Sequence, residues 1–340
     1  MRTPTATVSI LLPFHNAAAT LAPCLHSIGC QTLNAFEVLA LDDGSWDESA
    51  DLIREWAQRD PRVRLLQPGR VGLVQALNLG IAAARSDLIA RMDADDLMHP
   101  ERLARQVAYL AAHPAVALIA SRVELFPAEA VHVGYREYIR WQNSSLTPDE
   151  IANNIYIESP FAHPSVMFRR SAVDAVGGYR AGPFPEDYDL WLRMHAAGMP
   201  MARLPDVLLR WREWAERTSR TDPRYARSAF DQLRAHYLAR DPRLHSGRAL
   251  VIWGAGRKTR QRAQLLIAQG FPPKAWIDID PNKIGQRVWG IPVQPPGWLA
   301  QHPRPYVLIY VTNHGARDEV IEPILRGLGY RVGQDYLAVG

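Results

Sequence analysis

The sequence predicts an α/β protein with two domains, each built on a mostly parallel sheet flanked by helices. Short apolar runs alternate with amphipathic stretches along most of the chain, which is the pattern of strand–helix–strand crossover units. The chain has 340 residues, and a single hydrophobic core rarely grows beyond about 250–300 residues. We therefore expect domains over residues 1–245 and 246–340, joined by a polar, proline-bearing linker.

The first part of the chain alternates regularly between predicted strands and helices. Each strand is a short apolar run, and each helix has apolar residues at helical spacing. The predicted strands are 8–12, 36–41, 63–66 and 88–92, and the predicted helices are 17–28 (with Thr20 as its cap), 49–59, 74–84 and 100–112. Because ligands bind at the carboxyl ends of parallel strands, the residues after these strands are the first candidates for a functional site.

The middle of the chain is less regular, but several element ends are marked. Thr147, Pro148 and Glu150 have the spacing of a capping box and predict a helix beginning near residue 148. Further strands are predicted at 116–126, 164–168 and 204–211, and further helices at 171–176, 187–197 and within 222–241. These elements complete the predicted first domain.

The predicted second domain begins like a dinucleotide-binding unit. A strand at 249–253 leads into Gly254-Ala255-Gly256, which permits a tight turn and the close approach of a phosphate. Thr259 replaces the third glycine of that fingerprint, whereas Asp278 and Asp280 follow the next strand, where a ribose-binding acid is expected. Two alternatives follow: a Rossmann-like accessory domain, which we favour, and an NAD(P)-binding enzyme.

Composition excludes several classes of protein. Hydrophobic residues make up 47% of the chain and charged residues 22%, so a collagen-like or disordered chain is excluded. The two cysteines, Cys24 and Cys30, cannot form a disulfide scaffold, and we expect both to stay reduced. The net charge of +4 suits an anionic ligand or membrane surface, but it is too weak and scattered to indicate a nucleic-acid partner.

The sequence shows neither a membrane span nor a secretion signal. No apolar run approaches the roughly 20 residues that a spanning helix needs, and residues 1–16 lack the long apolar stretch of a signal peptide. We therefore expect a cytoplasmic protein that contacts a membrane peripherally, at its inner face, if at all.

Two predicted strands of the first domain end in acidic residues. Asp42 and Asp43 follow one strand, and the sequence Asp93-Ala94-Asp95-Asp96 follows another. Two carboxylates one residue apart can converge on Mg²⁺, which takes one or two carboxylates and completes its shell with water and substrate phosphates. Such a site would neutralise a nucleoside diphosphate as a leaving group. The alternative is a solvated turn or a cap, with Asp96 capping the next helix.

A further acidic pair, Glu186 and Asp187, begins the helix predicted at 187–197. Acidic residues are favourable at a helix N-terminus because of the helix dipole, so the pair could be capping residues only. Alternatively, Asp187 faces a cleft as a general base. The residue types alone leave both interpretations open.

Four segments taken together resemble family 2 glycosyltransferases of the GT-A fold. They are Val8–Asn16, Phe36–Ser45, Arg91–Asp96, and Gly177–Tyr179 followed by Glu186–Trp191, in the order and spacing of the family. The resemblance covers about residues 5–220. It implies a bacterial enzyme of polysaccharide biosynthesis that transfers a sugar, with inversion, from a nucleotide-sugar donor of the UDP-sugar type to a hydroxyl of a glycan or lipid-linked acceptor.

The resemblance also implies roles for residues around the donor. Pro13 and Asn16 would lie beside the nucleotide, and Asp42 or Asp43 would hydrogen-bond its base or ribose. Asp93 would contact the ribose or sugar.

The remaining implied roles concern the metal and the acceptor. Asp95, together with Asp93, would bind Mg²⁺ or Mn²⁺ on the diphosphate. Asp187 would deprotonate the acceptor hydroxyl, and Glu186 would lie at the donor. Trp191 would either line the acceptor cleft or belong to the core.

Two residues depart from the family pattern. Trp214 stands where the family often has a histidine, and His163 is either its replacement or a structural residue. Trp46 stands where a small polar residue is usual. The missing histidine leaves a non-catalytic nucleotide-sugar or glycan-binding protein as the alternative function. The second domain would then serve as a scaffold, bind the acceptor or form a homodimer.

Overall fold

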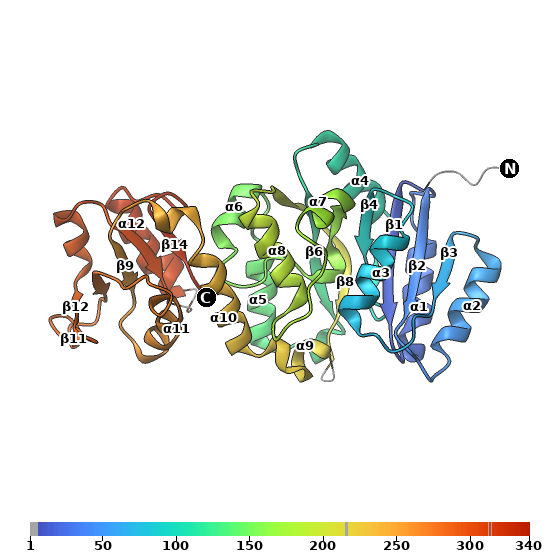
Figure 1. The fold of residues 1–340 in the computed structure, drawn as a ribbon, viewed down its shortest axis with the longest axis horizontal. Helices are drawn as coiled ribbons and strands as arrows, with labels where there is room; N and C mark the ends of the chain where they lie inside the picture. The colour runs from blue at the N-terminus through green and yellow to red at the C-terminus, as the bar shows by residue number, and fades with distance from the viewer. Residues whose placement is uncertain (1–5, 215–216, 312, 314) are drawn as a thin grey trace. The chain divides into compact units, whose positions relative to one another are not determined.

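The computed structural model describes residues 6–214, 217–311, 313 and 315–340. The polar residues 1–5, which the sequence places ahead of the first strand, lie outside the described residues. Contacts divide the chain into two compact units, the first comprising residues 1–151 and 160–222 and the second comprising residues 152–159 and 223–340. Each unit is a sheet flanked by helices (Figure 1).

The first unit contains an eight-stranded sheet with the order β3-β2-β1-β4-β7-β6-β8-β5. Its strands are β1 (Val8–Phe14), β2 (Phe36–Asp42), β3 (Val63–Leu66), β4 (Leu88–Arg91), β5 (Leu97–Met98), β6 (Leu118–Phe126), β7 (Met167–Arg169) and β8 (Met201–Arg212). Strands β1 to β4 are parallel, as are β6 and β8, whereas β7 and β5 run antiparallel to their neighbours. The predicted parallel-rich α/β fold is confirmed.

Helices cover this sheet because its central strands are apolar on both faces. Every residue of β1 and β2 is buried, as expected for parallel strands between helical layers. The helices are α1 (Ala18–Gly29), α2 (Ser49–Arg59), α3 (Leu73–Ala83), α4 (Arg102–Ala112), α5 (Val133–Gln142), α6 (Pro148–Asn154), α7 (Arg170–Ala175), α8 (Glu186–Ala196) and α9 (Thr218–Thr221).

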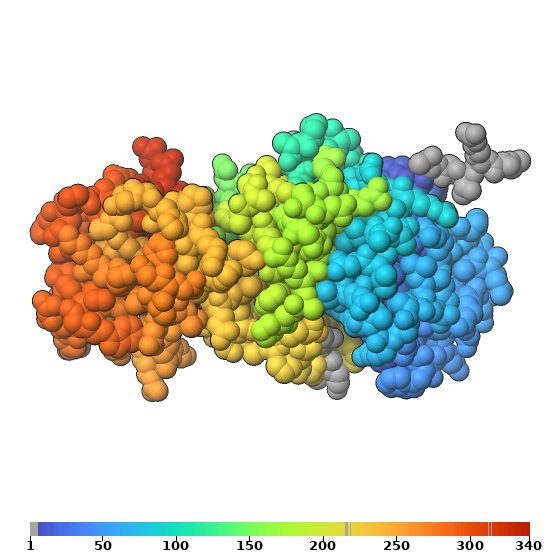
Figure 2. Space-filling model, viewed as in Figure 1, coloured from blue at the N-terminus to red at the C-terminus, as the bar shows by residue number. Residues whose placement is uncertain are grey.

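Helix α3 packs unusually closely on the sheet. A Cβ atom at Gly80 would lie 2.8 Å from side-chain atoms of both Leu11 and Leu41, so only glycine allows this approach to β1 and β2. In Figure 2 the region of α3, drawn in cyan, lies at the surface of the first unit in this view.

Two predicted caps have different outcomes. The capping box before α6 is confirmed, because Glu150 Oε2 accepts hydrogen bonds from the N–H groups of Leu146 and Thr147 at 2.9 Å. The prediction that Thr20 caps its helix is wrong, since α1 begins at Ala18. The side chain of Asp47 accepts a hydrogen bond from the Ala18 N–H at 3.1 Å instead, so a residue distant in sequence satisfies this helix end.

The second unit contains a six-stranded sheet with the order β11-β12-β10-β9-β13-β14. Its strands are β9 (Leu250–Trp253), β10 (Ala275–Ile277), β11 (Arg287–Val288), β12 (Ile291–Gln294), β13 (Tyr306–Ile309) and β14 (Tyr336–Ala338), and its helices include α10 (Arg227–Leu238), α11 (Arg257–Ile267) and α12 (Glu322–Gly327). All its strand pairs are parallel except β11–β12. The strand order reverses at β9, which is the doubly wound, Rossmann-like arrangement.

Residues 152–159 leave the first unit and join the second. Tyr156 is buried, and its hydroxyl donates a hydrogen bond to Asp241 Oδ2 at 3.0 Å. Arg234 Nη1 donates to the Ile157 carbonyl oxygen. The compact second unit thus includes residues 223–245, which the sequence assigns to the first domain, and a domain boundary at residue 245 stays a prediction.

Two further expectations concern cysteines and membranes. Cys24 is buried, Cys30 is exposed, and neither forms a disulfide. Within the described part of the chain, no helix has the length and apolar character needed to cross a bilayer.

Candidate active site

The strand order of the first unit defines where a ligand would bind. The order β3-β2-β1-β4 reverses direction between β1 and β4, and such a switch point is the usual ligand site of an open α/β sheet. Asp42, the last residue of β2, pairs with Phe14 at the end of β1, and Arg91 at the end of β4 pairs with Leu11. The predicted nucleotide and metal residues therefore follow adjacent strands at one edge of the sheet.

Asp42 and Asp43 hold the loops around this edge. Asp42 Oδ1 accepts a hydrogen bond from the Ser45 N–H at 2.8 Å, and its Oδ2 accepts one from Gln67 Nε2 at 2.9 Å. Asp43 Oδ1 accepts two backbone hydrogen bonds from the loop 70–72, both at 2.7 Å. Its Oδ2 accepts a hydrogen bond from Arg70 Nη1 at 2.8 Å. The predicted contacts of these carboxylates with a base or ribose stay predictions and would use their remaining lone pairs.

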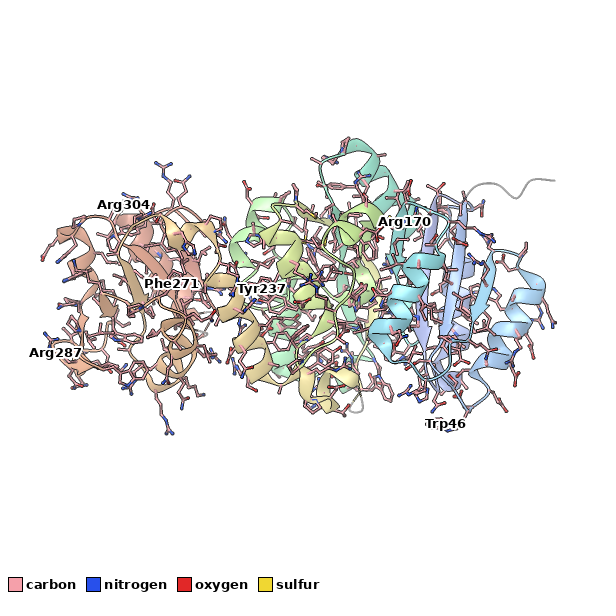
Figure 3. All side chains as sticks on the ribbon, in the orientation of Figure 1. Trp46, Arg170, Tyr237, Phe271, Arg287 and Arg304 are labelled. Carbon is pink, nitrogen blue, oxygen red and sulfur yellow. The ribbon has the colours of Figure 1, made fainter. Side chains whose placement is uncertain are left out.

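Asn16 joins the loop after β1 to the loop after β2. Its backbone has a φ of 50°, its N–H donates to Ser45 Oγ at 3.0 Å, and its Oδ1 accepts from the Trp46 N–H at 3.0 Å. The Trp46 side chain is 81% exposed, meets the His15 ring edge-on at 4.8 Å between centroids, and projects outward in Figure 3. Pro13 is buried in β1. These contacts make a rigid rim beside the switch point.

Asp93, Asp95 and Asp96 form a single cluster in the loop between β4 and β5. One carboxylate oxygen of each residue lies within 4.8 Å of the others. Burial and, after it, repulsion between these carboxylates raise the pKa of Asp95 and of Asp96. Asp96 Oδ2 is buried without a hydrogen-bond partner among the described residues. Converging oxygens, surplus negative charge and an unsatisfied buried oxygen fit a hard divalent cation.

The end of β8 contacts this acidic cluster. The Arg212 N–H donates to Asp96 Oδ1 at 2.7 Å, so the expectation that Asp96 caps the following helix is wrong. Arg212 Nε donates to the Asp95 carbonyl oxygen at 2.7 Å, and Trp214 Nε1 donates to Asp95 Oδ2 at 3.0 Å. The residue in place of the expected histidine is thus a direct partner of a predicted metal ligand.

Arg91 joins the acidic cluster to the predicted base. Its side chain is 3% exposed, and its Nη1 lies 2.5 Å from Asp93 Oδ1. The positive charge of Arg91 also offsets part of the rise in the pKa of Asp187 that burial and Glu186 cause, and it adds to burial in lowering the pKa of His163. One buried guanidinium therefore acts on both halves of the site, and the only sequence signal for it is a charged residue in an otherwise apolar strand.

Asp187, the predicted general base, lies in the first turn of α8. Burial and, after it, the Glu186 carboxylate raise the pKa of Asp187 to about 8. Its Oδ1 accepts a hydrogen bond from the Tyr188 N–H at 2.7 Å, so it also satisfies its own helix end. A carboxyl group with a pKa near neutrality is well matched to accept a proton from a hydroxyl group.

Histidine and tryptophan residues near α8 belong to the core. Burial lowers the pKa of His163, and its Nε2 lies 2.8 Å from the Tyr179 hydroxyl. This confirms the structural interpretation, and His163 is not part of the acidic cluster. Trp191 is fully buried and meets Phe161 and His163 edge-on, so the expectation that it lines an acceptor cleft is wrong.

A turn before α8 fixes this helix to α3. Asn78 Nδ2 donates to the Tyr179 carbonyl oxygen, and the Tyr179 N–H donates to Asn78 Oδ1, both at 2.9 Å. Gly178 precedes Tyr179 with a φ of 69°, and a Cβ there would lie 2.9 Å from Asn78 Oδ1. The turn therefore requires glycine at this position.

In the second unit, the glycine-rich turn is closed by its own acidic residue. Asp278 Oδ2 accepts a hydrogen bond from the Ala255 N–H at 2.9 Å, and Lys283 Nζ lies 3.2 Å from the same oxygen. The acid expected at a ribose is thus engaged within the protein, and this contact gives the NAD(P) alternative no support.

Comparison with known proteins identifies the family of this chain. The family model described as glycosyl transferase family 2 matches residues 9–177. The amylovoran biosynthesis glycosyltransferase AmsE of Erwinia amylovora is 35% identical over 207 residues, which cover 60% of this chain and 75% of AmsE. The O-antigen biosynthesis glycosyltransferase WbnJ of Escherichia coli is 26% identical over 232 residues, which cover 67% of this chain and 87% of WbnJ.

Solved structures show the same fold. The structure of S. aureus TarS 1–349 in complex with UDP-GlcNAc covers 77% of this chain and 79% of its own, with a TM-score of 0.53 and 15% identity. The fold and the relatives together define a glycosyltransferase of the GT-A fold. The chain belongs to glycosyltransferase family 2. The family model ends at residue 177, ahead of Asp187 and of residues 223–340, which make up most of the second unit.

Proposed function

We propose that this chain is a metal-dependent, inverting glycosyltransferase that transfers a sugar from a nucleotide-sugar donor to a hydroxyl of a glycan or lipid-linked acceptor. The main support for this proposal is one buried arginine, Arg91. Its side chain is paired with Asp93 of the acidic cluster, and its positive charge also favours the ionised form of Asp187. This observation supports a site in which leaving-group stabilisation and proton removal, the two needs of glycosyl transfer, occur close together.

The donor would bind at the switch point between β1 and β4. Pro13 and Asn16 would border the nucleotide, with Asp42 or Asp43 hydrogen-bonded to its base or ribose. Glu186 would lie on the sugar side. The TarS structure contains UDP-GlcNAc, which supports a UDP-sugar as the class of donor.

The carboxylates of the β4–β5 loop would bind Mg²⁺ or Mn²⁺, which supplies positive charge to the diphosphate when bound. Asp93 is paired with Arg91, whereas the Asp95 side chain has a neutral indole as its hydrogen-bond partner. The charge of the Asp95 carboxylate is therefore not balanced by a hydrogen-bonded cation, and Asp95 is the principal ligand. Asp93 assists it and contacts the ribose or sugar.

Asp187 would accept the proton of the acceptor hydroxyl while the hydroxyl oxygen attacks the anomeric carbon. The bond to the diphosphate breaks on the opposite face, so the configuration at that carbon inverts. Burial, which raises the pKa of Asp187 to about 8, makes its carboxylate a better proton acceptor than an exposed one.

The acceptor and location are inferred from relatives. AmsE and WbnJ are named for amylovoran and O-antigen biosynthesis, which supports a glycan or lipid-linked acceptor. We propose a cytoplasmic enzyme that visits the inner membrane face when its acceptor is lipid-linked. Residues 246–340 would form the accessory domain, which binds the acceptor or forms a homodimer.

A transfer assay with UDP-sugars and Mn²⁺ tests this function. Asp187→Asn and Asp95→Asn should each abolish transfer while the protein stays folded, whereas Asp51→Asn, at an exposed position of α2, should not. Full activity in Asp187→Asn would refute the base, and retention at the anomeric centre would refute inversion. Donor binding without any turnover would favour the non-catalytic alternative.

A further inference from the structure

We infer that Trp214 is a positioning residue for the divalent cation. Its indole N–H holds the Asp95 carboxylate, so that the only ligands which the protein offers to the cation are carboxylate oxygens. The inference rests on the proposed metal dependence and deepens it. It assigns a role to the residue that stands in place of the expected histidine.

The position of Trp214 is set by hydrogen bonds of the preceding strand end. Arg212 donates to Asp96 and Asp95 through its backbone N–H and its Nε. The Glu213 N–H donates to the Phe126 carbonyl oxygen at 2.8 Å. Trp214 follows directly, and its Nε1 lies 3.0 Å from Asp95 Oδ2.

The chemistry of indole limits what this contact can do. The indole N–H donates one hydrogen bond and has no lone pair for a metal, so Trp214 cannot be a ligand. It fixes one oxygen of Asp95 and leaves the other for the cation. Residues that hydrogen-bond to a metal ligand orient that ligand, and their loss typically reduces metal affinity by 10–100-fold.

The charge of the donor also matters. Arg91 offers a full positive charge to Asp93, whereas Trp214 orients Asp95 without neutralising it. Among the residues that the structure describes, the candidate ligand cluster contains aspartates alone. Oxygen-only sites favour Mg²⁺ and Mn²⁺, whereas imidazole nitrogen favours Zn²⁺, Co²⁺ and Ni²⁺. Trp214 therefore makes the site selective for hard cations.

Fluorescence and metal binding test this inference without an activity assay. Paramagnetic Mn²⁺, added with and without UDP, should quench part of the tryptophan emission, and electron paramagnetic resonance should report free Mn²⁺. In Trp214→Phe the quenched component should disappear, and Mn²⁺ should bind about 10–100-fold more weakly. Trp289→Phe, which removes an exposed tryptophan of the second unit, should change neither the amount of emission quenched nor the affinity.

A second variant tests the selectivity. Trp214→His supplies an imidazole and should increase the affinity for Co²⁺ and Zn²⁺ relative to Mg²⁺. Unchanged Mn²⁺ affinity and unchanged quenching in Trp214→Phe would overturn the inference and leave the proposed function intact. A wild-type protein that transfers sugar but binds no Mn²⁺ or Mg²⁺, with or without UDP, would overturn the metal dependence and the inference together.

Discussion

Asp187 is the residue whose ionisation should set the pH dependence of transfer. Its pKa is raised to about 8 by burial and by Glu186, and only the ionised form can accept a proton. We expect kcat/KM to rise with pH and to level off above about pH 8. Asp187→Asn should lose about 10²–10⁴-fold in rate and should lose this pH limb, as measured by pH–rate profiles.

The same shift predicts a change in stability. A folded-state pKa above the unfolded value of about 3.9 favours the neutral carboxyl group in the folded protein. The stability from this group is fully present below the unfolded pKa and is lost as pH rises through about 8. Asp187→Asn should therefore melt at an equal or higher temperature than the wild type at pH 9. A lower Tm there would contradict the raised pKa.

Arg91 should set both the pKa of the base and the binding of the donor. Its charge lowers the pKa of Asp187, and its Nη1 pairs with Asp93. Arg91→Met should move the acid limb of kcat/KM to higher pH and raise the donor KM. Arg91→Lys keeps the positive charge, so the acid limb of its kcat/KM profile should stay near the wild-type position. Its KM for the donor should still be raised. An unshifted limb in Arg91→Met would refute this coupling.

Residue types and the family resemblance were enough to name candidate residues. Asp93, Asp95 and Asp187 could be named as candidates because they lie at strand and helix ends within the family's motifs, and their roles stay predictions. The contact of Trp214 with Asp95 spans 119 positions, and no local pattern encodes it. Arg91 could not be assigned either, because only the fold brings it near Asp187 and His163, although Asp93 is two residues away.

At the scale of elements, the turn before α8 can be tested by a matched pair of glycines. Gly178 and Gly198 both have φ near +70° in the structure, but only at Gly178 would a Cβ meet another residue, Asn78. Gly198→Ala should lower the free energy of unfolding by about 1–2 kcal/mol through backbone strain alone. Gly178→Ala should cost more and should also reduce kcat, because it displaces the turn that leads to Asp187.

Denaturant unfolding and kinetics of the two variants check this prediction. Equal losses of stability with unchanged kcat in both would show that the link between Asn78 and Tyr179 does not position α8.

Elements with a local signal were predicted well, and those without one were not. Strand β3 and helix α2 lie at the predicted residues, because their apolar periodicity and end signals are contained in the segment itself. The antiparallel direction of β7 depends on its neighbours β4 and β6, which are distant in sequence. The misplaced cap at Thr20 has the same cause, since Asp47 supplies the hydrogen bond.

At the scale of the whole molecule, truncation distinguishes two domain boundaries. Residues 152–159 are held by residues such as Asp241 and Arg234. A chain ending at residue 245 keeps these partners, whereas a chain ending at residue 222 exposes the buried side chains of Ile155 and Tyr156. We expect 1–222 to aggregate or to melt at a lower temperature than 1–245.

Size-exclusion chromatography and thermal unfolding measure this difference. A 1–222 chain that is monomeric and more stable than 1–245 would show that the predicted boundary at residue 245 is wrong.

Because residues 152–159 belong to the second unit, the order in which the chain is synthesised affects how it folds. Asp241 follows Tyr156 by 85 residues, so translation at 5–20 residues per second leaves a delay of roughly 4–17 s before both have been made. During that interval the apolar side chains of Ile155 and Tyr156 have no cover. We therefore expect the first unit to be able to fold on the ribosome while residues 152–159 wait, exposed, for the later residues of the second unit.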